Sequence, residues 1–194
     1  MAYSDTYIND GFTIVEILIS IAIMGVIIAS VFSFSIAQRK YFSIQEEIAE
    51  MTQNTRAAMD MITGELSMAG YRPTGVIFSG IPYSTSQLQI YADLNGNGIV
   101  TDSNENIIYI YDASNKRILR NTGGGNQPFA ENIQSFTFEY LNDQGNATTV
   151  TGNIRQIRLT ITAQTSKPDR LYTANSGYRT YTLTSLVTPR NLAY

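Results

Sequence analysis

A long apolar segment with a single charge inside it constrains this chain more than any other feature. Residues 12–37 are apolar or small except for Glu16, the only charged residue among them. At a rise of about 1.5 Å per residue, a helix of this length exceeds the ~30 Å hydrocarbon core of a bilayer. A carboxylate is costly in such surroundings, so its presence there indicates a function. The segment therefore predicts a membrane-spanning helix.

The junction in front of this helix carries a specific pattern. Gly11-Phe12-Thr13, followed by Glu16 and an apolar helix, resembles the processing signal of type IV prepilins and type II secretion pseudopilins. In that family a prepilin peptidase cuts after the glycine and methylates the new N-terminal amine. The resemblance implies a leader of residues 1–11 and cleavage between Gly11 and Phe12. The helix would then stay on the product, unlike the apolar core of a cleaved secretory signal.

Two interpretations of Glu16 are open. Its carboxylate can face the amine that cleavage frees on Phe12, in its own chain or in a neighbour, or it can snorkel to the lipid headgroups. The resemblance implies pairing between subunits, in which Glu16 neutralises the N-terminal charge of an adjacent subunit in a filament core.

The resemblance also implies a location. It places the chain in the bacterial inner membrane, with its head in the periplasm or outside, and later in an extracellular filament. Arg39 and Lys40 follow the apolar run, and the positive-inside rule alone favours the opposite orientation.

Helical periodicity continues beyond the membrane segment. Gly70, followed closely by Pro73, predicts the end of the helix. Residues 38–70 are thus expected to form an amphipathic continuation of the same helix. Its apolar residues recur every three or four positions and form one stripe: Ile44, Ile48, Met51, Met59, Ile62 and Leu66.

Residues 71–194 change to a period of two, rich in β-branched and aromatic side chains. Turn residues at 113–116 and 142–145 separate several of these runs. The expected fold class is α+β, with a long N-terminal helix packed on an antiparallel β-sheet head. The strands are expected at residues 75–79, 87–92, 106–113, 116–121, 133–141, 154–165 and 178–187.

Several later segments also resemble one subgroup of the family. They are similar to PilW-like minor pilins, which are related to the GspJ pseudopilins. The similar segments are residues 106–112, 118–120, 131–133, 136–140, 154–155 and 189–192.

Composition excludes several kinds of chemistry. The chain has no cysteine and no histidine, so it lacks the common zinc ligands and the Ser-His and Cys-His nucleophile pairs. No pair of carboxylates stands out, and we expect no enzymatic activity and no required cofactor. The net charge of −3 gives no electrostatic support for nucleic-acid binding.

A polar stretch in the head spaces oxygen side chains as the start of an EF-hand loop does. Asn104 stands where the closing glutamate belongs, and no flanking helix is expected. A polar surface loop is the alternative, because Asn-Gly pairs form turns on their own. If the stretch holds Ca²⁺, the expected ligands are Asp93, Asn95, Asn97, the Ile99 carbonyl, Asp102 and Glu105.

The favoured function is structural: a minor pilin, processed and then built into or at the tip of a type IV pilus. Its expected partners are other pilin and minor pilin subunits, the prepilin peptidase, the inner-membrane assembly platform and, before assembly, membrane lipid. One alternative is a type II secretion pseudopilin. Another is a membrane-anchored binding module or adhesin that never polymerises.

Overall fold

The computed structural model describes residues 11–192 and is built on one long helix, α1, at Ile14–Ser67. Except for Gly11, the expected leader lies outside the described residues. The chain divides into two compact units between Gln45 and Glu46, so we describe the two parts of α1 separately.

The first part of α1, up to Gln45, makes no apolar core of its own. From Ile14 to Phe42, its large apolar side chains are between 49% (Ile17) and 78% (Ile14) exposed. The most apolar stretch of the helix has a mean hydropathy of 2.7, and the helix is long and apolar enough to cross a membrane. Exposing these apolar side chains to water is unfavourable, so lipid or other chains are expected to cover them.

The second part of α1 packs against the head and agrees with the predicted stripe. Its buried residues recur at intervals of three or four, as one face of a helix requires. The one buried hydroxyl on this face, Thr55 Oγ1, donates to the Met51 carbonyl at 2.6 Å, so it is not left unsatisfied. The buried residues are Met51, Thr55, Ala58, Met59, Ile62 and Leu66.

The helix ends where the sequence predicts it. Gly70 adopts a left-handed backbone with φ of 77°, the conformation that commonly terminates helices. Its amide donates to the Tyr91 carbonyl at 2.8 Å and so ties the helix end to the first strand. An added Cβ on Gly80 would lie 2.4 Å from the Gly70 nitrogen, so these two glycines allow a close backbone contact.

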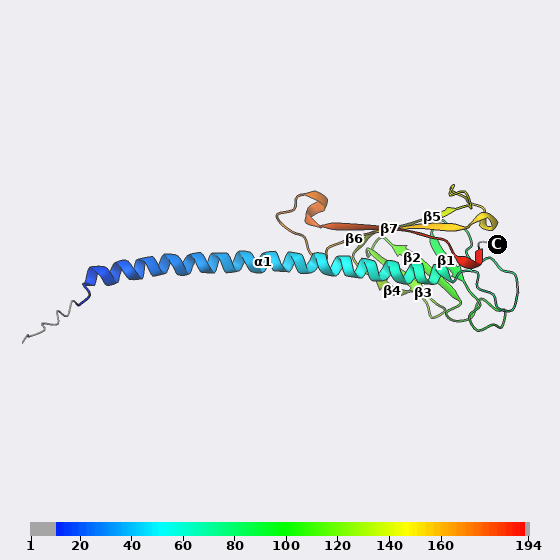
Figure 1. Cartoon of the computed structure of the whole chain (residues 1–194), viewed down its shortest axis with the longest axis horizontal. Coiled ribbons are helices and arrows are strands. Elements are labelled where there is room, and N and C mark those ends of the chain that lie inside the picture. The colour runs from blue at the N-terminus through cyan, green and yellow to red at the C-terminus, as the bar shows by residue number, and fades with distance from the viewer. Residues whose placement is uncertain (1–10, 193–194) are drawn as a thin grey trace, which may run out of the picture. The chain divides into compact units, whose positions relative to one another are not determined.

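The head contains two antiparallel sheets, with orders β1-β2-β3-β4 and β5-β6-β7 (Figure 1). Short 3₁₀ helices lie at Thr151–Asn153, Ala174–Gly177 and Arg190–Leu192. The strands are β1 (Gln87–Tyr91), β2 (Asn106–Asp112), β3 (Arg117–Asn121), β4 (Gln127–Ala130), β5 (Ile133–Leu141), β6 (Gln156–Gln164) and β7 (Thr180–Val187).

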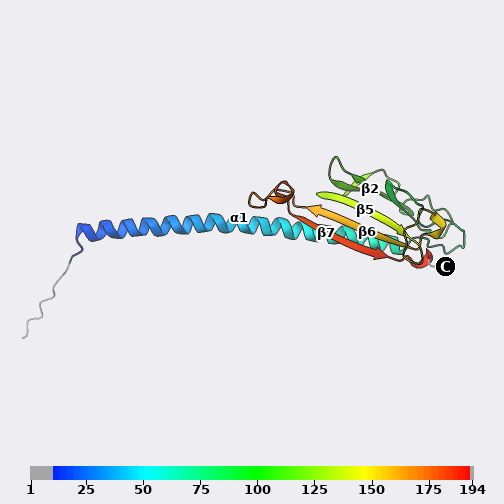
Figure 2. The same ribbon diagram turned by 90° about the horizontal axis from the view of Figure 1, so that it is seen from above.

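One core joins the second part of α1 to both sheets, and Figure 2 shows β5, β6 and β7 running along this part of the helix. The Tyr111 hydroxyl of β2 donates to the Ile133 and Gln134 carbonyls of β5, which connects the sheets. The α+β class with a long helix on antiparallel sheets is therefore confirmed. The core includes Ile62 and Leu66 of α1, Leu88, Ile90, Tyr109 and Ile118 of the first sheet, and Ile157, Leu159 and Ile161 of the second.

Two details of the strand prediction are wrong. Residues 75–79 form no strand, and Ile77 is 86% exposed. The short strand β4 was missed; it contains Pro128, which cannot donate to a sheet ladder and therefore suits an edge strand such as β4.

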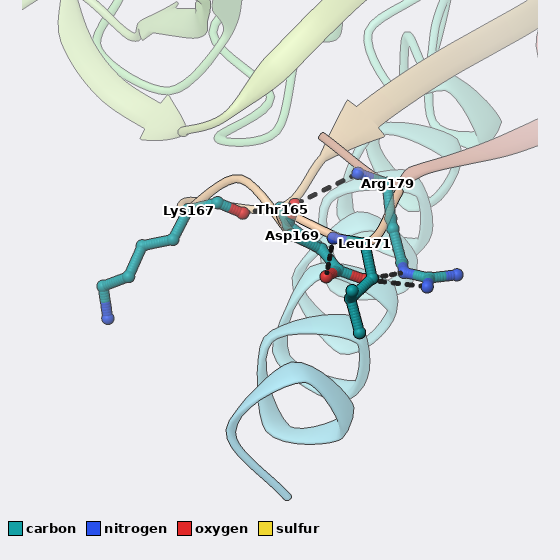
Figure 3. A network of polar contacts seen from close by, with 5 residues as sticks. All are labelled: Thr165, Lys167, Asp169, Leu171 and Arg179. Atoms are coloured by element: carbon teal, nitrogen blue, oxygen red, sulfur yellow. Dashed lines mark hydrogen bonds and ion pairs between the residues drawn. The ribbon is translucent and has the colours of Figure 1, made fainter. Parts of the chain in front are cut away.

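The connection between β6 and β7 is fixed by an internal polar network (Figure 3). The Asp169 carboxylate accepts hydrogen bonds from the Leu171 amide at 2.9 Å and from the Arg179 guanidinium at 2.8 Å. Thr165 Oγ1 accepts from the Arg179 amide and donates to the Lys167 carbonyl. The network gives this connection a defined shape beside α1, where Ser166 donates to the Glu47 carboxylate.

Candidate functional site

The predicted cleavage junction lies at the start of the described chain and is open to its surroundings. Phe12 is 85% exposed, and an added Cβ on Gly11 would meet nothing within 4 Å. A protease could therefore reach the bond between the two residues without unfolding a packed structure. The assignment of Gly11 and Phe12 as a processing site stays a prediction.

Glu16 caps the first turn of α1. Its Oε2 accepts hydrogen bonds from the Thr13 amide at 2.8 Å and the Thr13 hydroxyl at 2.9 Å. The Thr13 hydroxyl accepts in return from the Glu16 amide at 3.3 Å. Thr13 and Glu16 thus form a reciprocal capping box, which satisfies amide donors that a helix start otherwise leaves free.

The capping box adds a local structural explanation for Glu16 to the assembly interpretation. It occupies Oε2, whereas no hydrogen bond to Oε1 is found within residues 11–192. A carboxylate oxygen can accept more than one hydrogen bond, so capping leaves room for a further partner. The sequence could have shown this contact, because Thr13 and Glu16 have the T-x-x-E spacing of a capping box.

The hydroxyl groups of Ser20, Ser30 and Ser33, in the apolar part of α1, are satisfied within the helix. Ser20 donates to the Glu16 carbonyl at 2.7 Å, and Ser30 and Ser33 bond in the same way to the carbonyls four residues earlier. Internal bonding of this kind lowers the cost of placing a hydroxyl in lipid or among apolar helices.

The second candidate site is the loop of residues 93–105, which joins β1 to β2. Asp93 is 0% exposed and lies at its start. Its Oδ1 accepts from the Gly96 amide at 2.8 Å, and its Oδ2 accepts from the Gly98 amide at 3.1 Å. The Thr74 hydroxyl, which sequence reasoning missed because it is distant in the chain, also donates to Oδ2 at 3.0 Å.

Glu105, at the other end of this loop, turns back to the loop's beginning. Its Oε1 accepts from the Leu94 and Asn95 amides, each at 2.8 Å. Its Oε2 is the one buried side-chain nitrogen or oxygen in the described part of the chain without a hydrogen-bond partner. Although Glu105 comes one position late for an EF-hand, the structure places its carboxylate against the loop.

The remaining predicted ligands lie on the exposed side of the loop. Asp102 Oδ2 accepts from the side-chain amides of Asn95 at 3.1 Å and Asn97 at 2.8 Å. The Asn97 side-chain oxygen in turn accepts from the Ile99 amide at 2.7 Å. Among the described residues, no three Asp, Glu, His or Cys side chains gather closely enough to hold a metal ion by themselves. Calcium at this loop stays a prediction.

A third polar cluster ties α1 to the first sheet, and sequence reasoning did not foresee it. Glu65 pairs with Arg120 of β3 at 2.6 Å and accepts from the Tyr109 hydroxyl of β2. Burial, together with the adjacent Glu65 carboxylate, raises the pKa of Tyr109 above its ordinary value. The cluster is structural, since it fixes the register between the helix and the sheet.

Comparison with known proteins agrees with the pattern at the N-terminus. One structure that the chain is similar to is a type IV-like pilin from Thermus thermophilus, with a TM-score of 0.48 and 15% identity. The match covers 73% of this chain and 98% of that one. None of the curated proteins matches the chain. Residues 9–32 match the family described as "Prokaryotic N-terminal methylation motif".

The matched residues include Gly11, Phe12, Glu16 and the start of the exposed apolar helix. The chain carries the N-terminal methylation motif of prokaryotic type IV prepilins.

Proposed function

We propose that this protein is a structural subunit of a type IV pilus, made as a prepilin, held in the inner membrane and cut between Gly11 and Phe12. The observation that carries the proposal is the methylation motif at residues 9–32, continuous with an apolar helix that no part of its own unit covers. The motif supplies the processing signal, and the helix supplies the surface for assembly.

The physical chemistry of the exposed helix favours a polymer over a single soluble chain. In lipid the apolar side chains of α1 are already solvated, so transfer into a filament gains little from the hydrophobic effect. Once outside the membrane, the same side chains would meet water, at about 1.5–3 kcal/mol for each large apolar residue. Packing against like helices of neighbouring subunits avoids this cost.

Glu16 is proposed to set the register of that packing. Cleavage frees an amine on Phe12, and a positive charge carried into an apolar core needs a partner. The Glu16 carboxylate of an adjacent subunit provides the opposite charge, while Thr13 continues to hold its Oε2. Misaligned subunits would leave both charges unpaired, so the pair favours one stagger.

The finer assignment to minor pilins of the PilW type is part of the proposal. It is supported by the later segments of the head that resemble that subgroup. Other pilin subunits, a prepilin peptidase and an inner-membrane assembly platform are the partners it requires. A pseudopilin of a type II secretion system would share these steps, and genes neighbouring this one, for pilus assembly or for a secretion channel, separate the two.

The processing step can be tested with paired glycine variants. An added side chain at Gly11 or Gly25 meets nothing within 4 Å, so neither substitution should disturb the described structure. The N-terminal peptide mass of the chain in membranes is measured for wild type, Gly11→Val and Gly25→Val, with and without the prepilin peptidase.

We expect wild type and Gly25→Val to begin at methylated Phe12 only when the peptidase is present, and Gly11→Val to keep its leader. A wild-type chain that retains Met1–Gly11 in the presence of the peptidase would contradict the proposal. That outcome would favour a membrane-anchored binding module that never polymerises.

A further inference from the structure

We propose that the loop of residues 93–105 binds a calcium ion, with Glu105 as the residue that closes the site. The proposal concerns the folded head and does not depend on filament assembly. It starts from two buried carboxylates in one loop, Asp93 at 0% and Glu105 at 3% exposure.

Within the part of the chain that the structure describes, these carboxylates have no cationic partner. None of the salt bridges found among residues 11–192 includes Asp93, Asp102 or Glu105. Elsewhere in the same unit, the buried Asp169 is paired with Arg179, and the half-buried Glu65 of α1 is paired with Arg120. Because a buried charge without compensation is strongly unfavourable, a bound cation is the simplest source of the missing positive charge.

The orphaned oxygen of Glu105 marks one side of the site. Its sister oxygen, Oε1, accepts two amides at the beginning of the loop, so the carboxylate faces the loop backbone. Oε2 is shielded from water and has no donor within the described residues. A buried oxygen left without a donor is rare in folded proteins and calls for an ion or another unseen partner.

Asn104 stands at the expected closing position of the loop, and its backbone conformation explains why the next residue, Glu105, faces the loop instead. Asn104 has a left-handed backbone with φ of 68°, and its amide donates to the Thr122 carbonyl at 3.0 Å. This bend turns the next residue inward. The Glu105 carbonyl accepts from the Ala92 amide at 3.0 Å, which holds it beside the end of β1.

The other ligands keep free lone pairs in the present arrangement. A carboxylate offers about four lone-pair sites and an amide oxygen two. Asp93 uses three of its sites on Gly96, Gly98 and Thr74, and the amide oxygens of Asn95 and Asn97 each accept one backbone amide. Asp102 and the Ile99 carbonyl complete a set of ligands in which every atom that would bind the ion is oxygen.

This donor set suits calcium better than other common cations. Ca²⁺ accepts about six to eight oxygen ligands in flexible geometry, including amide and backbone carbonyl oxygens. Mg²⁺ demands a near-octahedral arrangement and gives up its water reluctantly. Because the acidic side chains do not converge as a group of three, neutral oxygens must contribute and the affinity should be modest.

A bound ion would also reinforce the end of α1. The Asp93 amide donates to the Tyr71 carbonyl at 2.8 Å, and Thr74 bonds the Asp93 carboxylate. Tyr71 and Thr74 both belong to the segment that follows the helix. Calcium would therefore hold together the start of the loop, the exit of the helix and the beginning of β2.

The test is thermal unfolding of the full chain in detergent, after removal of metals with a chelator and addition of CaCl₂ or MgCl₂. With a dissociation constant of about 0.1–1 mM, about 10 mM Ca²⁺ should raise Tm by roughly 3–10 °C. Calorimetric titration of the metal-free chain with CaCl₂ should show one ion bound per chain. Mg²⁺ at the same concentration should raise Tm by much less.

Three variants separate binding from a purely structural contribution. Glu105→Gln keeps a side-chain oxygen for the Leu94 and Asn95 amides but removes the buried charge. We expect it to be at least as stable as wild type without metal and to lose most of the calcium shift. Asp102→Asn, at a partly exposed position, should weaken the shift without risk to folding, and the exposed turn variant Asp143→Asn should keep it.

An unchanged wild-type Tm together with no heat of calcium binding would overturn the proposal. A full calcium shift in both Glu105→Gln and Asp102→Asn would overturn it as well, because the ion would then lie elsewhere. An equal response to Mg²⁺ would contradict calcium as the specific occupant. If Glu105→Gln fails to fold, the calorimetric titration of Asp102→Asn decides.

Discussion

Glu16 has a contact seen within its own chain and a proposed contact with another chain. The first is the capping box with Thr13, and the second is the pairing with a neighbour's Phe12 amine. Glutamine can occupy the same position of a capping box, but it carries no charge. A substitution at Glu16 can therefore separate helix capping from charge pairing between subunits.

We predict that Glu16→Gln impairs assembly as severely as Glu16→Ala. Losing the carboxylate leaves an amine unpaired in an apolar core, a cost of about 3–5 kcal/mol for each added subunit. The measurement is the amount of each variant in sheared filaments relative to the amount in membranes. Normal incorporation of Glu16→Gln alongside failure of Glu16→Ala would show that only capping matters.

The contact between Gly70 and Gly80 is the tightest backbone approach of any described glycine. An alanine Cβ at position 80 would lie 2.4 Å from a backbone nitrogen, which cannot move aside as a flexible side chain can. We predict that Gly80→Ala lowers the free energy of unfolding by about 1–3 kcal/mol or more. Gly124→Ala is the control, because its Cβ meets nothing within 4 Å, and a change below about 0.5 kcal/mol is expected.

Chemical unfolding of the full chain in detergent measures both glycine variants. Equal stability of Gly80→Ala and Gly124→Ala would mean that the close approach is absent. Sequence reasoning identified Gly70 as a helix stop, because a glycine followed by proline is a local signal. It could not identify Gly80, because that constraint arises only when the segment before β1 comes against the end of the helix.

At the scale of elements, sequence periodicity predicted those helices and strands whose formation is marked within a single segment. The strand β5 was predicted at the residues where it occurs, since apolar and aromatic residues mark it clearly. Residues 75–79 contain a similar run of β-branched and aromatic residues, yet they find no neighbouring strand, and residue type alone cannot show whether a partner exists. The division of the strands into two sheets also depends on pairing between segments that are distant in the sequence. It could not be predicted from the pattern within any one segment.

The contact between α1 and the β6–β7 connection should respond to acid. The Ser166 hydroxyl beside Glu47 is the largest of the influences that hold the pKa of the Glu47 carboxyl below its ordinary value of 4.5. Lys167 pairs with the same carboxylate at 3.1 Å, but its side chain is 78% exposed, so this ion pair contributes little. Because the folded state favours the ionised form, Glu47 stabilises the head above pH 4.5, and this contribution is lost as pH falls through the lowered pKa.

We predict that Glu47→Gln lowers the free energy of unfolding by about 0.5–1.5 kcal/mol at neutral pH. The difference from wild type should shrink once the pH falls below the ordinary pKa of the carboxyl. Glu46→Gln is the control, since Glu46 is exposed on the same helix, and it should leave the pH profile unchanged. A difference for Glu47→Gln that stays constant down to acidic pH would contradict this assignment.

At the scale of the whole molecule, the chain combines a unit whose apolar helix is exposed with a unit that buries its own core. The N-terminal unit was predictable because its signal is local: Gly11, Phe12, Glu16 and an unbroken apolar run. The 93–105 loop was predictable as a spacing of oxygen ligands, but the inward turn of Glu105 and the contribution of Thr74 required the fold. The partners of the head leave no comparable mark in the sequence.

The most direct measurement of the central claim is the N-terminal peptide mass of this chain in filaments sheared from cells. The account predicts a chain that begins with N-methylated Phe12 and is present in the sheared fraction as well as in membranes. A chain that still carries Met1–Gly11 and is found only in membranes would contradict it.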